Sequence, residues 1–343
     1  MHASSSCPFV AGPKITDPGL FVGRKEELRF LARRMSGAQP VSVNVIGERR
    51  IGKSSLLYHF FQTWEQRVNN PARFVVVYID LQEDDPPTEA DFYRLLAGAL
   101  DRPAVAQIGP LRSALSPLPG THKDFSKLLD AFAAQDLLPV FCLDEFEKLL
   151  KRQEQFTDSF FDRLRGFMNA NRLMLIPASR KSLDVCAGEH QLTSAFFNLG
   201  HVLKLGELTE EEAEKLVCLP AHAPPALEPK DQRLARKWGG RHPYLLQLAA
   251  TALFETRQFG KKTKWARKLF EEQRCRIRPV SVWKRYAGWI LKIFPKLPKH
   301  ATDCKPIMSC VLVLVVVLAV GYAWWSGQLP VKDILDFLSK LVK

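Results

Sequence analysis

Five short apolar segments occur in the first 205 residues of the chain. Each is five to eight residues long, is rich in valine, isoleucine, leucine or phenylalanine, and is separated from the next by stretches with helical character. The segments are 41–46, 74–80, 138–145, 173–179 and 201–205. Apolar runs that alternate with helices are typical of parallel strands buried on both faces. The pattern therefore predicts an α/β fold with a parallel, doubly wound sheet and helices on both faces.

One later segment is apolar over a much greater length. Residues 307–325, IMSCVLVLVVVLAVGYAWW, contain no charge over 19 positions. As a helix they would extend roughly 28 Å, close to the hydrocarbon thickness of a bilayer. Tyr322, Trp324 and Trp325 gather at one end, as aromatic residues do at a membrane interface. The segment predicts a transmembrane helix. The alternative is a buried core helix or strand, although strands rarely reach this length.

Two amphipathic stretches flank this apolar segment. In residues 282–294, aromatic and aliphatic side chains share one helical face, and Lys284, Arg285 and Lys292 share the other. This pattern is typical of a helix among lipid headgroups, and also of an ordinary helix of a globular domain. After the apolar segment, Pro330 opens a second stretch, which would lie on the opposite leaflet or mediate self-association.

Positive charge is concentrated next to the apolar segment. The formal net charge is +13, yet residues 1–256 contain 31 basic and 31 acidic side chains. Residues 257–300 contain 14 lysines and arginines against two glutamates. An excess at that place favours an anionic lipid leaflet as partner over nucleic acid, which is the alternative. Basic residues before the segment and a nearly balanced tail after it predict a cytoplasmic N-terminal part, with residues 326–343 on the far side.

Cysteine usage and the N-terminus agree with a cytoplasmic location. The seven cysteines are scattered without metal-ligand spacing, so we expect neither a zinc site nor a disulfide framework. The first residues lack a charged start followed by an apolar core, so we expect no signal peptide.

A phosphate-binding loop follows the first predicted strand. Residues 47–54 read GERRIGKS, the pattern G-x-x-x-x-G-K-[ST], between that strand and a predicted helix. Its two glycines allow the backbone N–H groups to point at a phosphate. Lys53, a candidate catalytic residue, would bring a positive charge to the β- and γ-phosphates, and the Ser54 hydroxyl would bind Mg²⁺. The nucleotide-binding residues predicted in this loop are Gly47, Glu48, Arg49, Arg50, Ile51, Gly52, Lys53, Ser54 and Ser55.

An acidic pair ends the strand predicted at 138–145. Asp144 is expected to hold Mg²⁺ together with Ser54, and Glu145 is expected to activate the attacking water as a catalytic residue. The alternative is a strand that happens to end in two solvated carboxylates. The presence of the phosphate-binding loop favours the first interpretation.

The strand predicted at 173–179 ends next to an arginine. The ends of parallel strands meet at one edge of the sheet, so Ser179 or Arg180 could sense the γ-phosphate. The alternative is an arginine at the end of a strand that faces solvent.

These residues together resemble the STAND class of signal-transducing NTPases, an AAA+-like branch of the P-loop ATPases, over roughly residues 8–250. Residues 47–57, GERRIGKSSLL, are close to the G-x-R-R-x-G-K-S-S-L-L of that class. Residues 18–28, PGLFVGRKEEL, are similar to a box that lines the adenine pocket in relatives. The resemblance implies nucleotide contacts by Phe21, Val22, Gly23 and Arg24.

Two further boxes resemble the start and the middle of the helical lid of such ATPases. Residues 208–213, LTEEEA, are similar to the capping box where the lid begins. Residues 239–247, GGRHPYLLQ, are similar to a lid motif, which implies that His242 and Pro243 approach the nucleotide. Because the boxes end at residue 247, a chain cut before Arg257 is expected to keep nucleotide binding.

Patterns and resemblance together predict six parts of the chain and one function. The parts are an N-terminal segment (1–17), a nucleotide-binding domain (18–205), a helical lid (206–275), a basic juxtamembrane segment (276–306), a transmembrane helix (307–325) and an amphipathic tail (326–343). We expect a membrane-tethered regulatory ATPase that uses ATP and Mg²⁺ and whose nucleotide state controls self-association or binding of a signalling partner protein. The alternatives are a nucleic-acid-handling AAA+-type ATPase and a nucleotide-binding scaffold with little hydrolysis.

Overall fold

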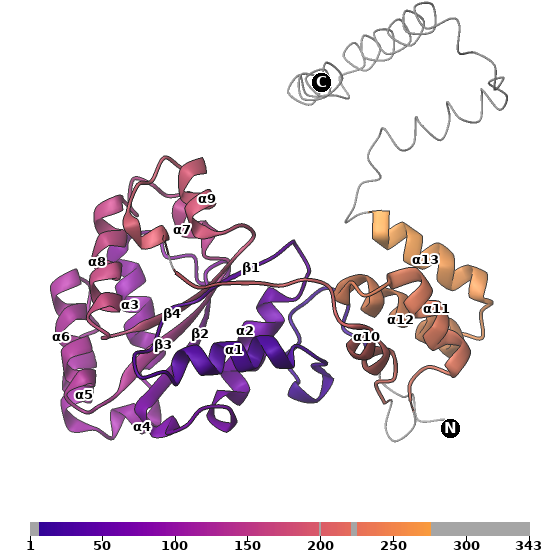
Figure 1. Ribbon diagram of the computed structural model, residues 1–343, viewed down its shortest axis with the longest axis horizontal. Helices are drawn as coiled ribbons and strands as arrows, with labels where there is room; N and C mark the ends of the chain where they lie inside the picture. The colour runs from indigo at the N-terminus through magenta and orange to yellow at the C-terminus, as the bar shows by residue number, and fades with distance from the viewer. Residues whose placement is uncertain (1–6, 199, 221–224, 276–343) are drawn as a thin grey trace, which may run out of the picture. The chain divides into compact units, whose positions relative to one another are not determined.

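A single parallel sheet forms the centre of the protein. The computed structural model describes residues 7–198, 200–220 and 225–275 (Figure 1). Five strands pair in the order β2-β3-β4-β1-β5, and every pairing is parallel. The strands are β1 (Asn44–Ile46), β2 (Phe74–Asp80), β3 (Leu138–Asp144), β4 (Met174–Ser179) and β5 (Val202–Lys204). The predicted five-stranded parallel α/β fold is confirmed.

Strand β1 is shorter than the apolar run that predicted it. The Ser42 hydroxyl accepts the N–H of Leu175 at 2.9 Å, in the place of a backbone carbonyl. One residue later, the N–H of Val43 donates to the carbonyl of Leu175 at 3.1 Å. A side-chain acceptor therefore interrupts the regular ladder at Ser42, and β1 begins only at Asn44.

Side chains of the central strands alternate between two hydrophobic cores. Phe141 and Leu175 belong to the first core, whereas their neighbours Val140 and Ile176 belong to the second. Helices of the first face are α3 (Glu89–Leu100), α4 (Pro103–Ala106), α5 (Gly109–Leu115), α6 (His122–Ala133), α7 (Glu147–Leu150), α8 (Asp158–Asn169) and α9 (Leu183–Glu189). Helices of the second face are α1 (Lys25–Met35) and α2 (Lys53–Thr63). Both faces of the sheet are covered, as a doubly wound fold requires.

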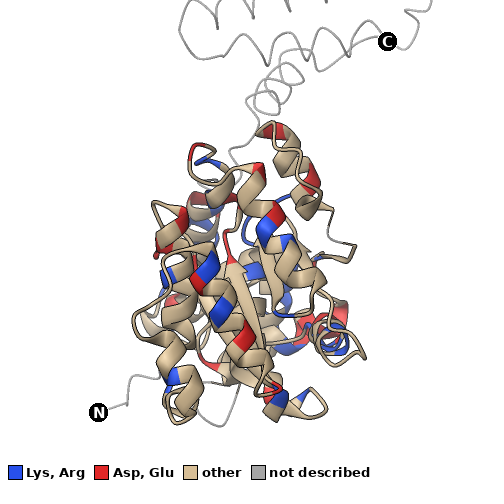
Figure 2. Ribbon diagram, turned by 90° about the vertical axis from the view of Figure 1, so that its left-hand side faces the viewer, with Lys and Arg blue, Asp and Glu red and all other residues tan. Residues whose placement is uncertain are grey.

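Short 3₁₀ helices lie in the connections of the sheet. They are η1 (Pro18–Leu20), η2 (Trp64–Gln66), η3 (Pro71–Arg73) and η4 (Ala195–Phe197). On the face of the protein shown in Figure 2, basic and acidic residues alternate along the helices. This mixture agrees with the balanced charge of residues 1–256.

Four helices follow β5 and enclose a third hydrophobic core. They are α10 (Glu210–Val217), α11 (Pro229–Gly239), α12 (Pro243–Gln258) and α13 (Thr263–Cys275). At the start of α10, the Thr209 hydroxyl accepts the N–H of Glu212 at 3.2 Å. The Glu212 carboxylate accepts the N–H of Thr209 at 3.0 Å in return. The predicted capping box is confirmed, and we refer to residues 206–275 as the lid.

The last helix of the lid is part of its core. Ala266 and Phe270 of α13 are fully buried, and the Phe270 ring lies 5.9 Å from the ring of Trp238. A chain cut before Arg257 would lose this helix and expose the lid core beneath it. Retention of nucleotide binding by such a chain stays a prediction, and it would have to hold with an incomplete lid core. Residues 1–276 form one compact unit, which places the boundary after α13.

The segments predicted to meet the membrane lie outside the described residues. They are the juxtamembrane stretch 276–306, the transmembrane helix 307–325 and the tail 326–343. Among the helices that the structure describes, none combines the length and the apolar character needed to cross a bilayer.

Candidate nucleotide-binding site

The loop between β1 and α2 has a backbone that only glycine allows at two points. Gly52 has φ +100° and directly precedes Lys53, the first residue of α2. At Gly47, a Cβ atom would lie 2.8 Å from a methyl carbon of Ile51 and 3.2 Å from the carbonyl oxygen of Leu205. The loop is thus curled against the end of β1, with its N–H groups and the N-terminus of α2 available to an anion.

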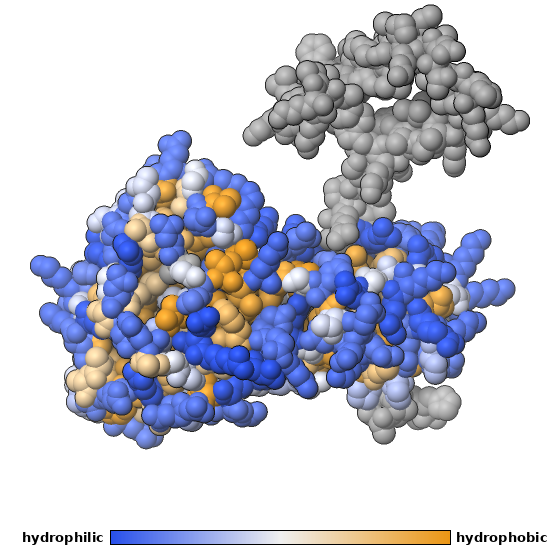
Figure 3. Space-filling model, viewed as in Figure 1, coloured by the Kyte–Doolittle hydropathy of each residue, from blue (hydrophilic) through white to orange (hydrophobic). Residues whose placement is uncertain are grey.

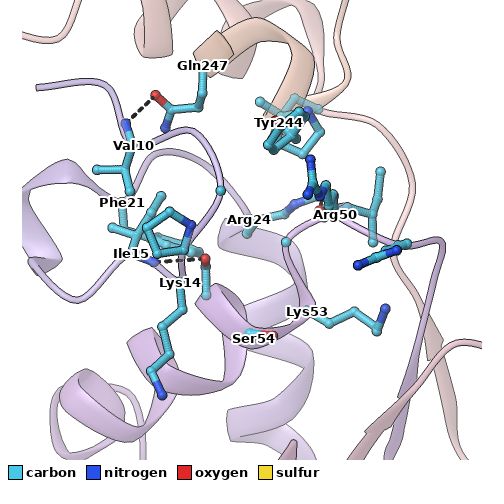
Figure 4. Close-up of a pocket in the computed structure, with 18 of the residues that line it drawn as sticks. Val10, Lys14, Ile15, Phe21, Arg24, Arg50, Lys53, Ser54, Tyr244 and Gln247 are labelled. Atoms are coloured by element: carbon cyan, nitrogen blue, oxygen red, sulfur yellow. Dashed lines mark hydrogen bonds between the residues drawn. The ribbon is translucent and has the colours of Figure 1, made fainter. Parts of the chain in front are cut away.

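Lys53 lies inside this loop. Its ammonium group donates to the carbonyl oxygens of Gly47, at 2.9 Å, and of Glu48, at 3.2 Å. Burial lowers the pKa of Lys53, while the nearby carboxylates of Glu147, Glu145 and Asp144 oppose this shift. A phosphate oxygen that enters the loop would compete with the two carbonyls for the same ammonium group (Figure 4).

Ser54 and Asp144, the two predicted metal ligands, are brought together. Asp144 is 1% exposed, at the end of β3, and it lines one pocket together with Ser54. Burial raises the pKa of Asp144, while the nearby Ser54 hydroxyl and a hydrogen bond from the Tyr78 hydroxyl, at 3.0 Å, oppose this shift. A hydroxyl and a carboxylate fit Mg²⁺, which takes few protein ligands and completes its shell with phosphate oxygens and water. Accordingly, the described residues contain no cluster of three acidic, histidine or cysteine side chains that could hold a metal alone.

Glu145 adopts a backbone conformation that is rare for a residue with a side chain. Its φ is +51°, and its N–H donates to the Asp144 carboxylate at 3.0 Å. Such a conformation costs about 1–3 kcal/mol and persists where the surroundings require it. It places Glu145 on the wall of the pocket that Lys53 and Ser54 also line.

A further carboxylate, Glu147, lies behind this wall. Both its oxygens are buried without a hydrogen-bond partner among the described residues, and one lies 3.6 Å from Nε of Arg180. Burial, reinforced by Glu145, raises the pKa of Glu147, while Lys53 and Arg180 oppose the shift. Sequence reasoning missed Glu147, since its burial on the first turn of α7 depends on tertiary packing.

The two candidate sensors at the end of β4 are in different surroundings. The Ser179 hydroxyl is fully buried, accepts from the Asn44 amide at 2.9 Å and donates to the Lys181 carbonyl at 2.6 Å. Arg180 is 58% exposed and lines the pocket. Of the two, Arg180 is therefore the side chain that a bound nucleotide could reach.

The box at residues 21–24 contributes to the pocket unevenly. Phe21, Val22 and Arg24 line it, whereas Gly23 faces the lid, where a Cβ atom would lie 2.7 Å from the Glu212 side chain. Phe21 stacks on the His59 ring with centroids 4.0 Å apart. Burial, with a smaller effect of a neighbouring arginine, lowers the pKa of His59 to about 4, so this ring is neutral at pH 7.

Arg24 is buried and joins three parts of the chain. Its guanidinium donates to the carbonyl of Ile51 in the loop, at 3.2 Å, and to the carbonyl of Gly206 at the start of the lid, at 2.6 Å. It also pairs with Glu27 at 2.9 Å, and its backbone N–H donates to Glu212 of the lid at 2.7 Å. Most of its donors are therefore engaged by protein groups.

An N-terminal segment, residues 7–16, forms a wall of the pocket that sequence reasoning missed. The Val10 N–H donates to the Gln247 side chain at 3.1 Å, and the Ile15 N–H donates to the Ser55 hydroxyl at 3.1 Å (Figure 4). Lys14 lies 3.5 Å from Asp80 and over the ring of Tyr78. The segment is thus bonded to the lid at one end and to the core at the other.

The same segment is anchored in the lid by an aromatic residue. Phe9 is 5% exposed, belongs to the lid core, and packs edge-on against Phe254 with centroids 6.4 Å apart. No contiguous motif indicates this arrangement, because Phe9 and Phe254 are far apart in the sequence.

The lid supplies the remaining wall. Pro243, Tyr244 and Gln247 of α12 line the pocket, and the Arg50 guanidinium of the loop lies 4.4 Å from the Tyr244 ring centroid. His242 is buried as the N-cap of α12 and is not among the residues that line the pocket. Of the predicted His-Pro pair, Pro243 is therefore the one that a nucleotide could contact. Gly47, Glu48 and Asp144 are not among the residues that line this pocket, and Asp144 lines a second pocket together with Ser54 and Glu145.

Comparison with known families identifies the chain. Residues 14–267 match the family described as Novel STAND NTPase 1. The chain belongs to this family. The match covers the loop, the acidic pair and almost all of the lid, so this Novel STAND NTPase is a P-loop NTPase. A comparison with curated proteins finds no match.

Solved structures show the same fold in distant proteins. The Walker-type ATPase PABY2304 of Pyrococcus abyssi is 15% identical over 82% of this chain and 80% of its own, with a TM-score of 0.57. The ORC2 protein of Aeropyrum pernix in its ADP form is 18% identical over 77% of this chain and 70% of its own, with a TM-score of 0.53. Of the ORC1 protein of Aeropyrum pernix, solved in complex with DNA, this chain spans 66%.

Proposed function

We propose that this STAND NTPase is a membrane-tethered regulatory ATPase. ATP bound at the phosphate-binding loop would contact the core, the N-terminal segment and the lid at once. Hydrolysis would change how the lid is held, and this change would control self-association or the binding of a signalling partner protein. The observation that carries the proposal is the lining of one pocket by residues of all three parts: Lys53 from the loop, Val10 from the segment and Gln247 from the lid.

The residues of the pocket suit hydrolysis of a nucleoside triphosphate. Loop N–H groups and Lys53 would hold the β- and γ-phosphates, and Arg180 would move from Glu147 to the γ-phosphate. Ser54 and Asp144 would hold Mg²⁺, which neutralises charge on phosphate oxygens when bound. Glu145 would take a proton from the attacking water. A scaffold that only binds nucleotide would not need Glu145, so the position of this carboxylate on the pocket wall favours the enzyme.

Membrane attachment is supported by the sequence of the C-terminal part. Residues 307–325 carry no charge, and the basic excess precedes them. A single-pass anchor with the ATPase in the cytoplasm, beside an anionic leaflet, accounts for both features. A nucleic-acid-handling ATPase is the second candidate. It is favoured by exposed lysines of the lid, but the mixed charges on the face of the core in Figure 2 do not form a basic stripe.

Energy transfer between two dyes tests the proposed lid movement. We would place one dye at the exposed position 65 of the core and the other at the exposed position 237 of the lid, in full-length protein with its native cysteines replaced. The transfer efficiency should differ between ATP and ADP, and it should not respond to nucleotide in the Lys53→Ala variant. Equal efficiency in both nucleotides, under conditions where ATP is shown to bind, would contradict the proposal. Light scattering of the same samples would report self-association.

A further inference from the structure

The turn between α12 and α13 carries two exposed aromatic side chains. Phe259 is 64% exposed and Trp265 is 37% exposed, and among the described residues no other phenylalanine or tryptophan is as accessible. Their ring centroids lie 6.4 Å apart at an interplanar angle of 77°. On the face shown in Figure 3, the lid surface is largely hydrophilic. An exposed aromatic pair is therefore unusual for the surface of the lid. Exposed aromatic pairs mark interaction sites more often than isolated residues do.

The backbone holds this turn in a defined conformation. Gly260 has φ +59°, and the N–H of Lys261 donates to the Thr256 carbonyl at 2.8 Å, closing the end of α12. The N–H of Trp265 donates to the Lys262 carbonyl at 2.8 Å. The two aromatic residues are thus presented together by the ends of two packed helices.

Three lysines between the aromatic residues complete a surface that we call the basic aromatic turn, residues 259–265. Lys261, Lys262 and Lys264 are exposed, and none forms an ion pair with another described residue. Neighbouring basic residues differ in this respect: Arg257 pairs with Glu228 and Asp231, and Arg267 pairs with Glu271. The positive charge of the turn is therefore available to a partner outside the described residues.

We infer that the basic aromatic turn docks the lid onto an anionic lipid surface. Lysines attract acidic headgroups, while tryptophan and phenylalanine enter the boundary between headgroups and acyl chains. The edge-to-face pair presents no open, parallel platform of the kind on which nucleic-acid bases stack, so lipid is favoured over nucleic acid. This inference rests on the proposed function, in which the protein is attached to a membrane. Because 31 residues separate Cys275 from the apolar segment at residue 307, the lid could never be farther than roughly 110 Å from the bilayer.

Flotation with lipid vesicles tests the inference on residues 1–276, the compact unit that contains all three hydrophobic cores. Vesicles that contain phosphatidylserine should bind the protein, in a manner weakened by salt, and vesicles of phosphatidylcholine alone should not. Replacement of Lys261, Lys262 and Lys264 by alanine should lower partitioning on the order of 100-fold, at about fivefold per lysine.

Two variants make the test specific. The Phe259→Ser/Trp265→Ser double variant should lose at least tenfold in partitioning, although its charge is unchanged. The matched control replaces Lys215, Lys230 and Lys237, three exposed lysines elsewhere on the lid that form no ion pair with a described residue, and it should lose no more than a few-fold. Thermal unfolding of each variant would verify that it is folded.

Several results would overturn the inference. The first is that folded wild-type 1–276 does not float with phosphatidylserine vesicles. The second is that the turn variant and the lysine control lose partitioning equally. The third is that duplex DNA or RNA binds through the same lysines more tightly than the vesicles do. Carbonate extraction of the full-length protein separates this question from membrane attachment. If full-length protein resists extraction while 1–276 does not float, only the docking of the turn fails. If carbonate releases the full-length protein, the proposed anchor fails, and flotation of 1–276 still decides the inference.

Discussion

Replacing Arg24 by alanine is expected to lower the free energy of unfolding by about 3–6 kcal/mol. The guanidinium donates to two carbonyls, of Ile51 and of Gly206, from a side chain that is 4% exposed. Each bond from a charged donor contributes about 1.5–3 kcal/mol, and alanine would leave both carbonyls without this partner. The pair with Glu27 adds to this loss by about 1 kcal/mol or more, since its two side chains are only 5% and 21% exposed.

Urea unfolding of residues 1–276, followed by circular dichroism and tryptophan fluorescence, measures this loss. The Arg24→Lys variant should fall between wild type and alanine, because a single ammonium nitrogen cannot replace both Nη2, which donates to the two carbonyls, and Nη1, which pairs with Glu27. Arg29→Ala, on the helix α1 that Arg24 precedes, is the matched control: Arg29 is 53% exposed and pairs with an exposed glutamate, so the change should stay within about 0.5 kcal/mol. A loss below about 1 kcal/mol for Arg24→Ala, with an unchanged urea dependence, would refute the assignment of Arg24 as a structural link between loop and lid.

Three further predictions concern the acidic residues and the topology. Glu145→Gln should keep ATP affinity and slow phosphate release by orders of magnitude, as measured in a coupled assay; turnover like that of wild type would place the base elsewhere. Glu147 has a raised pKa when folded, so its ionisation opposes folding as the pH rises above the unfolded value of 4.5. Glu147→Gln should therefore raise the melting temperature at pH 7 to 8 and give no gain below pH 4.5; a gain that does not depend on pH would contradict this reasoning. In cells expressing cysteine-free protein, an impermeant maleimide should label a cysteine placed at Ser326 and not one placed at Ser126; the reverse pattern would overturn the orientation.

Local motifs account for the parts of the site that could be predicted. The loop at residues 47–54 and the acidic pair at 144–145 each stand at the end of a predicted strand. In each case the strand and the functional residues lie within one short stretch of sequence, so they can be recognised together. The parallel sheet follows for the same reason, because each buried strand is a separate apolar run. The shortening of β1 could not be predicted, since it depends on the contact of Ser42 with a distant strand.

Long-range contacts account for the parts that could not be predicted. Val10 and Gln247 are joined by a hydrogen bond across 237 positions of the sequence, and neither residue has chemistry that distinguishes it alone. Glu147 stands three positions after Asp144, but only packing shows that its carboxylate is buried beside Arg180. The role of α13 in the lid core could not be predicted either. This helix is rich in basic residues, and only its few apolar residues complete the core.

ATP binding and turnover by the full-length protein in detergent test the central claim most directly. Wild-type protein with Mg²⁺ should bind ATP, as measured by calorimetry, and should release phosphate. Lys53→Ala should do neither while it keeps the melting temperature of the wild type, because Lys53 is the side-chain cation that the loop holds at the phosphate site. Lys127→Ala, which changes a lysine that is 79% exposed on the surface, should behave as wild type does. Unchanged turnover in Lys53→Ala, or no ATP binding by folded wild-type protein, would contradict the account.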